Sequence, residues 1–296
     1  MPDWQAIREA LGDQGIETPG GPPPQPLGGG DISAAWRTTT DRGPIFLKTG
    51  DGAAFERLDA EAHGLRELAQ TRAVRVPKVL ASGRTDDHSF LALEWLSLKR
   101  PDAATAKLMG RQLAQQHRQH EKQFGWHRGN TIGNTPQINT RDDNWVRFFR
   151  ERRLHFQLEL AAENGFGGEL QDGGMRLAEG IERLFDDYDP QPSLLHGDLW
   201  GGNWASVEGE PVIFDPAVYY GDRESDIAMT RLFGGFGKEF YDAYEESWPL
   251  AAGHQRRLPL YQLYHVLNHL NLFGGAYLGQ SLHLMRKLNR PTSGRE

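Results

Sequence analysis

Two short apolar runs, residues 193–195 and 211–214, interrupt a region of the chain that otherwise carries helical patterns. Asp198 follows the first run, Asn203 lies five residues further along, and Asp215 ends the second run. A surface turn rich in glycine and asparagine is the alternative interpretation, but it does not require an apolar run before each end. The segment therefore predicts a loop between two short strands, set in a mainly helical lobe, that carries three polar side chains.

The order of these side chains matches the requirements of phosphoryl transfer. One carboxylate must accept the proton of the attacking hydroxyl, while an amide oxygen and a second carboxylate hold Mg²⁺ against the nucleotide phosphates. The five-residue spacing of Asp198 and Asn203 is also that of a kinase catalytic loop. We therefore predict Asp198 as the catalytic base, Asn203 and Asp215 as metal ligands, and ATP with Mg²⁺ as the cofactors.

A lysine and a glutamate complete the predicted nucleotide site. Lys48 lies at the end of an apolar strand, and residues 52–70 follow with apolar side chains at helical spacing. A lysine on a strand can reach the α- and β-phosphates while a glutamate on the next helix holds its ammonium group. Glu61 borders the buried face of the expected helix and is the predicted partner. An exposed Lys–Glu surface pair is the alternative.

A glycine-rich run near the amino terminus stands at an expected strand–turn–strand. Glycine lets the backbone approach phosphates closely, so the run predicts a loop that covers them. It lacks the terminal GK[ST] of a Walker A motif, and no helix follows it, so it is not a Rossmann fingerprint either. A purely structural turn is the alternative. The residues predicted to contact the nucleotide here are Gly28, Gly29, Gly30 and Ser33.

The pattern of strands and helices predicts an α+β fold in two parts. In the first part a short helix is expected at 3–12, strands at 32–40, 44–48, 76–81 and 89–96, and a longer helix at 52–70. The backbone of Glu94, Trp95 and Leu96, where the last strand leaves the small lobe, is the expected contact for adenine. The chain beyond it is mainly helical. We predict a small antiparallel β lobe with one helix and a larger helical lobe.

Composition excludes several classes of protein. The net charge of −7 argues against a nucleic-acid-binding protein. The chain has no cysteine, which excludes disulfides, thiolate metal sites and cysteine catalysis. No apolar run reaches the length of a membrane span, and the amino terminus lacks the pattern of a secretory signal. We therefore expect no nucleic-acid or membrane partner, a cytoplasmic location, and a monomer or weak dimer.

Longer stretches of the chain resemble one known family. The run His-Gly-Asp-Leu-Trp-Gly-Gly-Asn at 196–203 carries the HGD form of the catalytic loop found in small-molecule kinases. Phe-Asp-Pro-Ala at 214–217, the stretch 219–228 and the stretch 261–277 extend the match over nearly the whole chain. The chain resembles the fructosamine kinases (ketosamine kinases), within the protein-kinase-like and aminoglycoside-phosphotransferase-like superfamily.

The resemblance implies a two-lobed protein-kinase-like fold, with ATP between an amino-terminal lobe, residues 1–96, and a catalytic and substrate-binding lobe, residues 97–296. It places Asp198 at the sugar hydroxyl and assigns the other predicted residues the roles given above. The acceptor it implies is a hydroxyl, the 3-hydroxyl, of a ketosamine such as fructosamine or ribulosamine. The implied role is deglycation, because a 3-phosphorylated ketosamine is prone to lose its sugar.

Contacts to this glycated amine substrate are predicted near the same loop. Trp200 and Tyr219 offer flat surfaces for a sugar or its aglycone, with packing in the core as the alternative. Asp222 and Glu224 carry the charge needed to attract the ammonium group of an amino-sugar adduct. Asp226 is as readily an N-cap or a brace for the loop as a substrate contact.

Two other functions remain open at this point. One is a phosphotransferase that acts on another small alcohol, such as an aminoglycoside or choline. The other is a non-catalytic ATP-binding scaffold. The presence of Lys48, Asp198, Asn203 and Asp215 together argues against the scaffold, because ATP binding alone does not require all four.

Overall fold

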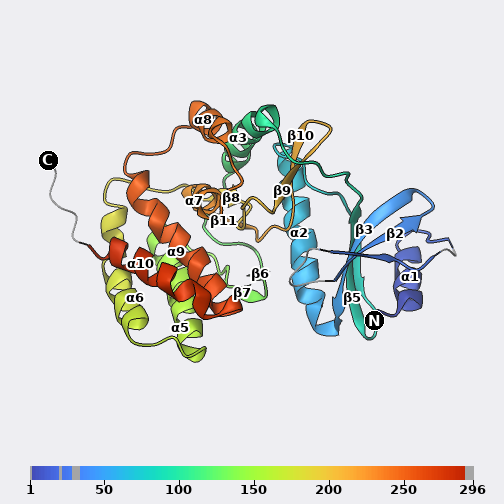
Figure 1. Ribbon diagram of the computed structural model, residues 1–296, viewed down its shortest axis with the longest axis horizontal. Helices are drawn as coiled ribbons and strands as arrows, with labels where there is room; N and C mark the ends of the chain where they lie inside the picture. The colour runs from blue at the N-terminus through green and yellow to red at the C-terminus, as the bar shows by residue number, and fades with distance from the viewer. Residues whose placement is uncertain (1, 20–21, 29–33, 291–296) are drawn as a thin grey trace.

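The computed structural model describes residues 2–19, 22–28 and 34–290, and it consists of a lobe built on a sheet and a mainly helical lobe (Figure 1). The sheet is antiparallel, with strand order β1-β2-β3-β5-β4. Its strands are β1 (Gln25–Leu27), β2 (Ala34–Thr40), β3 (Gly43–Asp51), β4 (Val79–Arg84) and β5 (His88–Glu94). Two helices accompany it, α1 (Trp4–Gly12) and α2 (Phe55–Thr71). The expected β2–β3 hairpin is present.

The two helices cover opposite faces of this sheet. On one face, Ile7 and Leu11 of α1 pack with Ile45 and Leu47 of β3. Successive side chains of a strand point to opposite faces, so Lys48 of β3 lies on the face of α2. A slip of one residue in the strand register would move this lysine to the other face. The apolar alternation of β3 therefore determines where its one lysine points.

The second lobe is mainly helical, as the sequence predicts. Its helices are α3 (Ala103–His117), α4 (Trp145–Phe149), α5 (Phe156–Glu163), α6 (Glu169–Glu179), α7 (Glu224–Leu232), α8 (Lys238–Ser247), α9 (His254–Phe273) and α10 (Leu278–Leu288). A π-helical segment (Arg150–His155) joins α4 to α5. Three small antiparallel pairs complete the lobe: β6 (Asn130–Ile132) with β7 (Thr135–Gln137), β8 (Ser193–Leu195) with β11 (Tyr219–Gly221), and β9 (Trp204–Val207) with β10 (Glu210–Ile213). The two-lobed α+β architecture is confirmed.

The two apolar runs predicted as short strands, 193–195 and 211–214, form β8 and β10. They do not pair with each other, because β8 pairs with β11 and β10 pairs with β9. The loop between β8 and β9 therefore carries Asp198 and Asn203, and Asp215 follows β10. The β9–β10 hairpin also contacts the chain on the sheet side of the molecule, since the Ile213 N–H donates to the Arg75 carbonyl at 3.0 Å.

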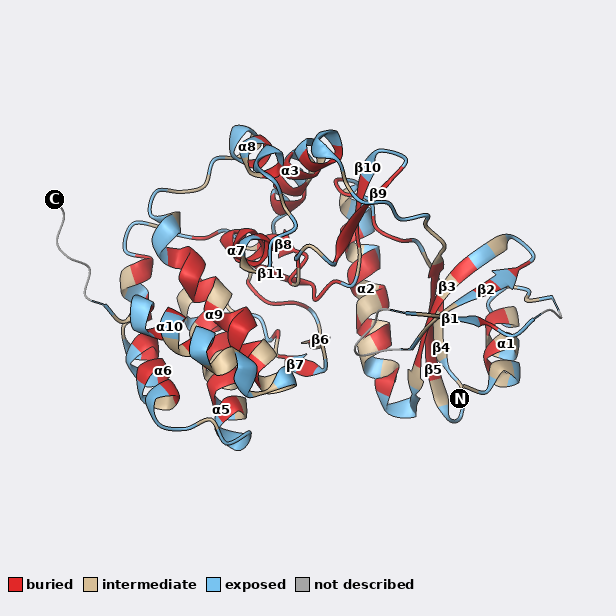
Figure 2. Cartoon of the chain, viewed as in Figure 1, coloured by how far each residue is buried: buried red, intermediate tan, exposed pale blue. Residues whose placement is uncertain are grey.

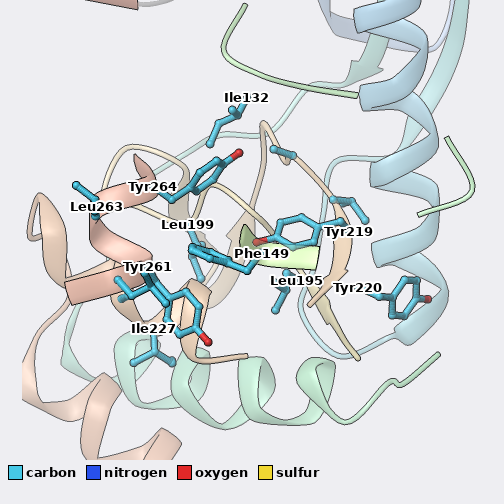
Figure 3. Close-up of a cluster of buried hydrophobic side chains, with 14 of the residues drawn as sticks. Ile132, Phe149, Leu195, Leu199, Tyr219, Tyr220, Ile227, Tyr261, Leu263 and Tyr264 are labelled. Carbon is cyan, nitrogen blue, oxygen red and sulfur yellow. The ribbon is translucent and has the colours of Figure 1, made fainter. Parts of the chain in front are cut away.

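One apolar core extends from the helical lobe to α2 and β5 of the sheet lobe, and Figure 2 shows buried residues in both lobes. Leu199, the neighbour of Asp198, is fully buried and lies among Phe149, Tyr261 and Tyr264 (Figure 3). Truncating such a buried leucine costs about 2–5 kcal/mol of folding free energy. The loop is therefore anchored through its own apolar side chain. Among the described residues, no helix combines the length and the apolar character needed to cross a lipid bilayer.

Candidate active site

The β8–β9 loop brings the first two predicted site residues into contact. The Asn203 side-chain amide donates to the Asp198 carbonyl at 2.9 Å and to its carboxylate oxygen Oδ2 at 3.2 Å. The Asn203 backbone N–H donates to the Trp200 carbonyl at 2.9 Å, which closes the turn between them. Asp198 keeps part of its surface open to solvent, whereas Asn203 is buried. The loop thus presents one carboxylate whose position is held by an amide.

The tight path of this loop depends on Gly197. Its φ is +83°, in the region that favours glycine, and a Cβ at this position would lie 2.0 Å from the Ala217 carbonyl oxygen. The neighbouring His196 carbonyl accepts a hydrogen bond from the Ala217 N–H at 2.9 Å. Any side chain at 197 would break this close approach. Glycine is therefore required between His196 and Asp198.

Asp226 braces the loop from α7. Its carboxylate accepts hydrogen bonds from the backbone N–H groups of His196 at 2.8 Å and Gly197 at 2.9 Å, and from His117 Nε2 at 3.1 Å. Burial raises the pKa of Asp226, but these hydrogen bonds outweigh it and hold the pKa below its usual range. Of the alternatives for Asp226, the structure favours the brace, since α7 begins two residues earlier at Glu224.

His196 links the loop to the segment that carries Asp215. Its Nε2 lies 3.0 Å from the Phe214 carbonyl, and its Nδ1 lies 3.3 Å from the Asp198 N–H. Burial lowers the pKa of His196, so the ring is neutral near pH 7. A neutral ring with its proton on Nε2 satisfies both contacts, because Nε2 then donates and Nδ1 accepts. The histidine thus ties Asp198 to the residue before Asp215.

Lys48 joins the two lobes at the site. Its Nζ lies 2.7 Å from Glu61 Oε1 on α2 and 2.7 Å from Asp215 Oδ1 after β10. Lys48 and Glu61 are nearly buried, while 48% of the Asp215 side chain is exposed. Burial lowers the pKa of Lys48, but the two carboxylates raise it by more, so the ammonium group stays charged. The structure brings together the pair predicted from the sequence and adds Asp215 to it.

The carboxyl group of Asp198 has an unusual electrostatic environment. Burial and, to a smaller extent, the nearby Asp215 carboxylate raise its pKa to about 7, against the opposing hydrogen bond from Asn203. A general base is most effective when its pKa lies near the working pH. Asp198 therefore has the electrostatic character of a group that exchanges protons near neutral pH.

The site carries an excess of negative charge that suits a cation. One ammonium group, on Lys48, faces the carboxylates of Glu61 and Asp215, with Asp198 close by. Mg²⁺ prefers oxygen ligands and is commonly bound through one or two protein side chains together with substrate phosphates. Two oxygen groups fit such a donor set: the half-exposed carboxylate of Asp215 and the side-chain oxygen of Asn203. The Asn203 oxygen is not used by Asp198, because the hydrogen bond to Asp198 comes from the amide nitrogen. Within residues 2–19, 22–28 and 34–290, no cluster of three or more histidines and acids forms a metal site from protein ligands alone.

The predicted adenine contact lies where the chain leaves the sheet. The Glu94 N–H donates to the Lys78 carbonyl at 2.9 Å, and the Glu94 carboxylate accepts from the Lys78 N–H at 3.1 Å. The guanidinium group of Arg37 lies 4.8 Å from the centre of the Trp95 ring. Leu96 packs against the β9–β10 hairpin. This segment therefore connects the sheet to the hairpin that precedes Asp215.

The glycine-rich run is only partly within the described residues. Gly28 lies directly after β1, which pairs with β2 through Leu27 opposite Ala35. The predicted contacts Gly29, Gly30 and Ser33 lie outside the described residues.

Helix α2 is attached to the helical lobe by contacts that the sequence did not suggest. Glu67 accepts hydrogen bonds from Trp126 Nε1 at 2.8 Å and from the Tyr220 hydroxyl at 2.9 Å. Arg128 donates to Asp59 at 2.6 Å. Partners separated by 59 and 153 positions leave no local pattern in a sequence. These bonds fix the helix that carries Glu61 against the lobe that carries Asp198.

Three of the tentative substrate residues lie inside the helical lobe. Tyr219, Asp222 and Glu224 are almost fully buried. Glu224 accepts two hydrogen bonds from Arg257, at 2.7 and 2.8 Å. Asp222 accepts from the hydroxyl groups of two tyrosines and from the Glu224 N–H. Their partners are internal, so this placement favours a structural role over contact with a substrate ammonium group.

Trp200 has a different position from these three residues. It follows Asp198 by two residues, and 40% of its surface is exposed. Its ring and the ring of Phe233 form a T-shaped pair, with the ring centres 6.4 Å apart. Trp200 is thus the one tentative substrate residue whose side chain the structure leaves accessible beside the loop.

The fold and this set of contacts define the class of protein. A sheet lobe with a Lys–Glu pair, joined to a helical lobe with an Asp–Asn–Asp series, is the arrangement of a phosphotransferase with kinase-like architecture. The family model for fructosamine kinase matches residues 3–290, and the chain belongs to this family.

Individual relatives agree with the family match. A probable ketoamine kinase of Synechocystis is 40% identical over 293 residues, which cover 97% of each chain. The chloroplastic protein-ribulosamine 3-kinase of rice, Oryza sativa subsp. indica, is 40% identical over 265 residues, which cover 88% of this chain and 76% of the rice protein. The crystal structure of a candidate fructosamine-3-kinase from Haemophilus somnus superposes with a TM-score of 0.88 at 28% identity, covering 97% of this chain and 98% of that one.

Proposed function

We propose that this enzyme transfers the γ-phosphoryl group of ATP to the 3-hydroxyl of a ketosamine, such as a fructosamine or ribulosamine. The observation that carries the proposal is the pairing of Lys48 with both Glu61 and Asp215, beside an aspartate, Asp198, whose pKa is about 7. Phosphoryl transfer depends on such positioning and charge stabilisation more than on covalent chemistry by the protein. The names of the ketoamine and ribulosamine kinase relatives support the acceptor class.

In the proposed step, the acceptor oxygen forms a bond to the γ-phosphorus while the bond from that phosphorus to the β,γ-bridging oxygen breaks. Asp198 takes the proton of the hydroxyl as the new bond forms, and ADP leaves. Lys48, kept charged by its two carboxylate partners, stabilises the α- and β-phosphates. Glu61 holds Lys48 in place.

Asn203 and Asp215 are the residues that would hold Mg²⁺. The ion would neutralise phosphate charge during the transfer. The chain's own contribution is to keep both oxygens in position: Asn203 through its bond to Asp198, and Asp215 through its bond to Lys48.

The two lobes take different substrates in this proposal. Residues 1–96 bind ATP, with Gly28, Gly29, Gly30 and Ser33 over the phosphates and the backbone of Glu94, Trp95 and Leu96 at adenine. Residues 97–296 bind the acceptor, with Trp200 as the accessible aromatic contact. Tyr219, Asp222 and Glu224 are not part of the proposed acceptor site, because they are buried and engaged with internal partners.

The proposed cellular role is deglycation, since the phosphorylated ketosamine is prone to lose its sugar and free the amine. A cytoplasmic location and a monomer or weak dimer remain predictions from the sequence.

A panel of acceptors tests the proposed function. Purified enzyme with ATP and Mg²⁺ is incubated with fructose and ribulose adducts of lysine, with aminoglycosides and with choline, and ADP formation is measured. We expect ADP to form with the adducts and to depend on Mg²⁺. Turnover of only the other alcohols would assign a different acceptor class. ATP binding without turnover of any acceptor would identify a scaffold.

A further inference from the structure

Exposed aromatic side chains gather next to the catalytic loop. The large apolar side chains that remain exposed within the described residues are Leu98, Met175, Trp200, Phe233 and Phe273. Three of these five belong to one cluster. The ring of Phe233 lies 6.4 Å from that of Trp200 and 4.7 Å from that of His269. We define the aromatic patch as Trp200, Phe233, Phe273, His269 and Tyr277.

The outer part of the aromatic patch is formed by the end of α9 and the segment that follows it. The ring of His269 lies 5.5 Å from that of Phe273 and 5.1 Å from that of Tyr277. The contact between His269 and Phe273 follows from helix geometry, because α9 places these two residues four positions apart and therefore on one helical face. The patch therefore runs from the catalytic loop to the end of α9.

Close glycine contacts fix the inner part of the patch. A Cβ on Gly202 would lie 2.3 Å from the Trp200 ring, so this ring rests directly on the backbone of its own loop. A Cβ on Gly235 would lie 2.5 Å from the Gly201 Cα, so the segment that carries Phe233 packs against the same loop. The rings are thus held in position without a ligand, and a molecule that binds them pays little ordering entropy.

The aromatic patch offers no charged partner from its own segments. Residues 199–207, 232–237 and 270–282 contain no aspartate, glutamate, lysine or arginine. Burial lowers the pKa of His269, so its ring is neutral near pH 7. Aromatic faces bind apolar carbon chains by contact, and they attract a cation through the ring electrons. The patch therefore suits an apolar chain that ends in an ammonium group.

We propose that the aromatic patch binds the amine-side carbon chain of the ketosamine, as found in a glycated lysine side chain, and sets the preference among acceptors. The inference rests on the proposed function. The aromatic patch is continuous with the catalytic site, because Trp200 stands two residues from Asp198 on the loop that ends at Asn203. A sugar positioned at Asp198 directs its amine substituent along this surface. The ring faces of the patch also contact the ammonium group of the ketosamine, a role that the buried Asp222 and Glu224 do not fill.

A series of fructose adducts with amines of increasing length tests the proposal. We compare methylamine, propylamine and pentylamine adducts by kcat/KM for wild type, Phe273→Ala and Met175→Ala. For wild type we expect kcat/KM to rise about twofold for each added methylene group, because a surface covers only one side of the chain and recovers part of the full burial effect. Phe273→Ala is expected to flatten the series. Met175→Ala removes an equally exposed apolar side chain from α6 and is expected to keep it.

The outcomes separate this proposal from the proposed function. Turnover of all adducts by wild type with no dependence on chain length would overturn the aromatic patch as the chain-binding surface and leave the kinase activity standing. An equal slope in Phe273→Ala and wild type, with a change in the monomer–dimer equilibrium of the variant by sedimentation, would assign the patch to self-association and overturn the proposal. No turnover of any adduct would overturn both proposals.

Discussion

Asp198 is the residue whose chemistry depends most on its surroundings. An isolated aspartate is ionised at neutral pH and is a weak base. Here burial and the Asp215 carboxylate both raise its pKa, and the Asn203 amide limits the rise. The same neighbours that fix its position therefore also make it a better proton acceptor. The sequence spacing predicted the identity of these residues, but not this balance, which depends on burial in the folded chain.

The pH dependence of the reaction follows from this pKa. Asp198 must be ionised to accept a proton, so the enzyme is impaired below its pKa and active above it. We expect the initial rate, measured with both substrates at limiting concentration, to rise with pH, to reach half of its plateau near pH 7, and to level off about one pH unit higher. A rate that stays constant as pH falls from about 8 to about 6 would show that no group with this pKa acts as the base.

The segment 219–226 shows how little the charge of a residue says about its role when its partners are unknown. Its acids resemble a site for a cation when only the sequence is considered. The partner of Glu224 is Arg257, which stands 33 positions away. Only the fold therefore shows that the charge of Glu224 is already balanced by a cation. The spacing of Asp198, Asn203 and Asp215 was informative because a local loop and hairpin hold all three.

At the scale of elements, the Glu224–Arg257 pair fastens α7 to α9. Both side chains are almost fully buried, so removing one charge leaves the other without a partner in the core. We expect Glu224→Gln to lower the free energy of unfolding by about 3–5 kcal/mol, measured by urea denaturation. The exposed pair of Glu246 and Arg111 provides the control, and Glu246→Gln is expected to change stability by less than about 1 kcal/mol.

The same variant tests the structural role assigned to Glu224. In Glu224→Gln, KM for a ketosamine and KM for an uncharged sugar analogue should change by the same factor. A rise in KM for the charged acceptor alone would show that the Glu224 carboxylate contacts the substrate and is not only structural.

Helix α2 is the element that connects the nucleotide side to the catalytic side. It carries Glu61 and is attached to the helical lobe through Glu67, which accepts from Trp126 and Tyr220. Glu67→Gln removes the negative charge that strengthens both hydrogen bonds and leaves a single acceptor oxygen, at a cost of about 1–3 kcal/mol. We expect KM for ATP to rise severalfold, because Lys48 loses its fixed partner, while binding of the acceptor changes less.

Steady-state kinetics and thermal unfolding of this variant separate the two effects. Arg66→Gln on the same helix is the control, because the Arg66 side chain is exposed. Equal KM values for ATP in Glu67→Gln and wild type would contradict a role for α2 in positioning Glu61.

The elements that the sequence missed are short and depend on turn geometry. The sequence predicted β10 but missed its partner β9, because the hairpin turns at Glu208 and Gly209, both with positive φ, and Glu-Gly is not among the strong signals for such a turn. The β6–β7 hairpin turns at Gly133 and Asn134, a known turn pair, but its strands of three residues are too short to show alternation. A long element such as α2 was predicted because its apolar periodicity extends over several turns.

At the scale of the whole molecule, the catalytic arrangement is divided between two lobes. Lys48 and Glu61 come from the sheet lobe, and Asp198, Asn203 and Asp215 come from the helical lobe. The ion pair of Lys48 and Asp215 is the direct contact between the two sets. Composition and periodicity predicted both lobes, but the meeting of these side chains is a property of the complete fold.

The central claim is that this chain phosphorylates the sugar 3-hydroxyl of a ketosamine with Asp198 as the base. It is tested most directly by ³¹P and ¹H NMR of the product formed from fructose-lysine. Wild type and Asp198→Asn are compared at equal enzyme concentrations and at a saturating concentration of ATP. For wild type we predict a phosphate ester coupled to the proton on carbon 3. For Asp198→Asn we predict the same product at a rate about 10²–10⁴-fold lower, with ATP affinity retained. A phosphate ester on another carbon, or a rate in the variant equal to that of wild type, would contradict this account.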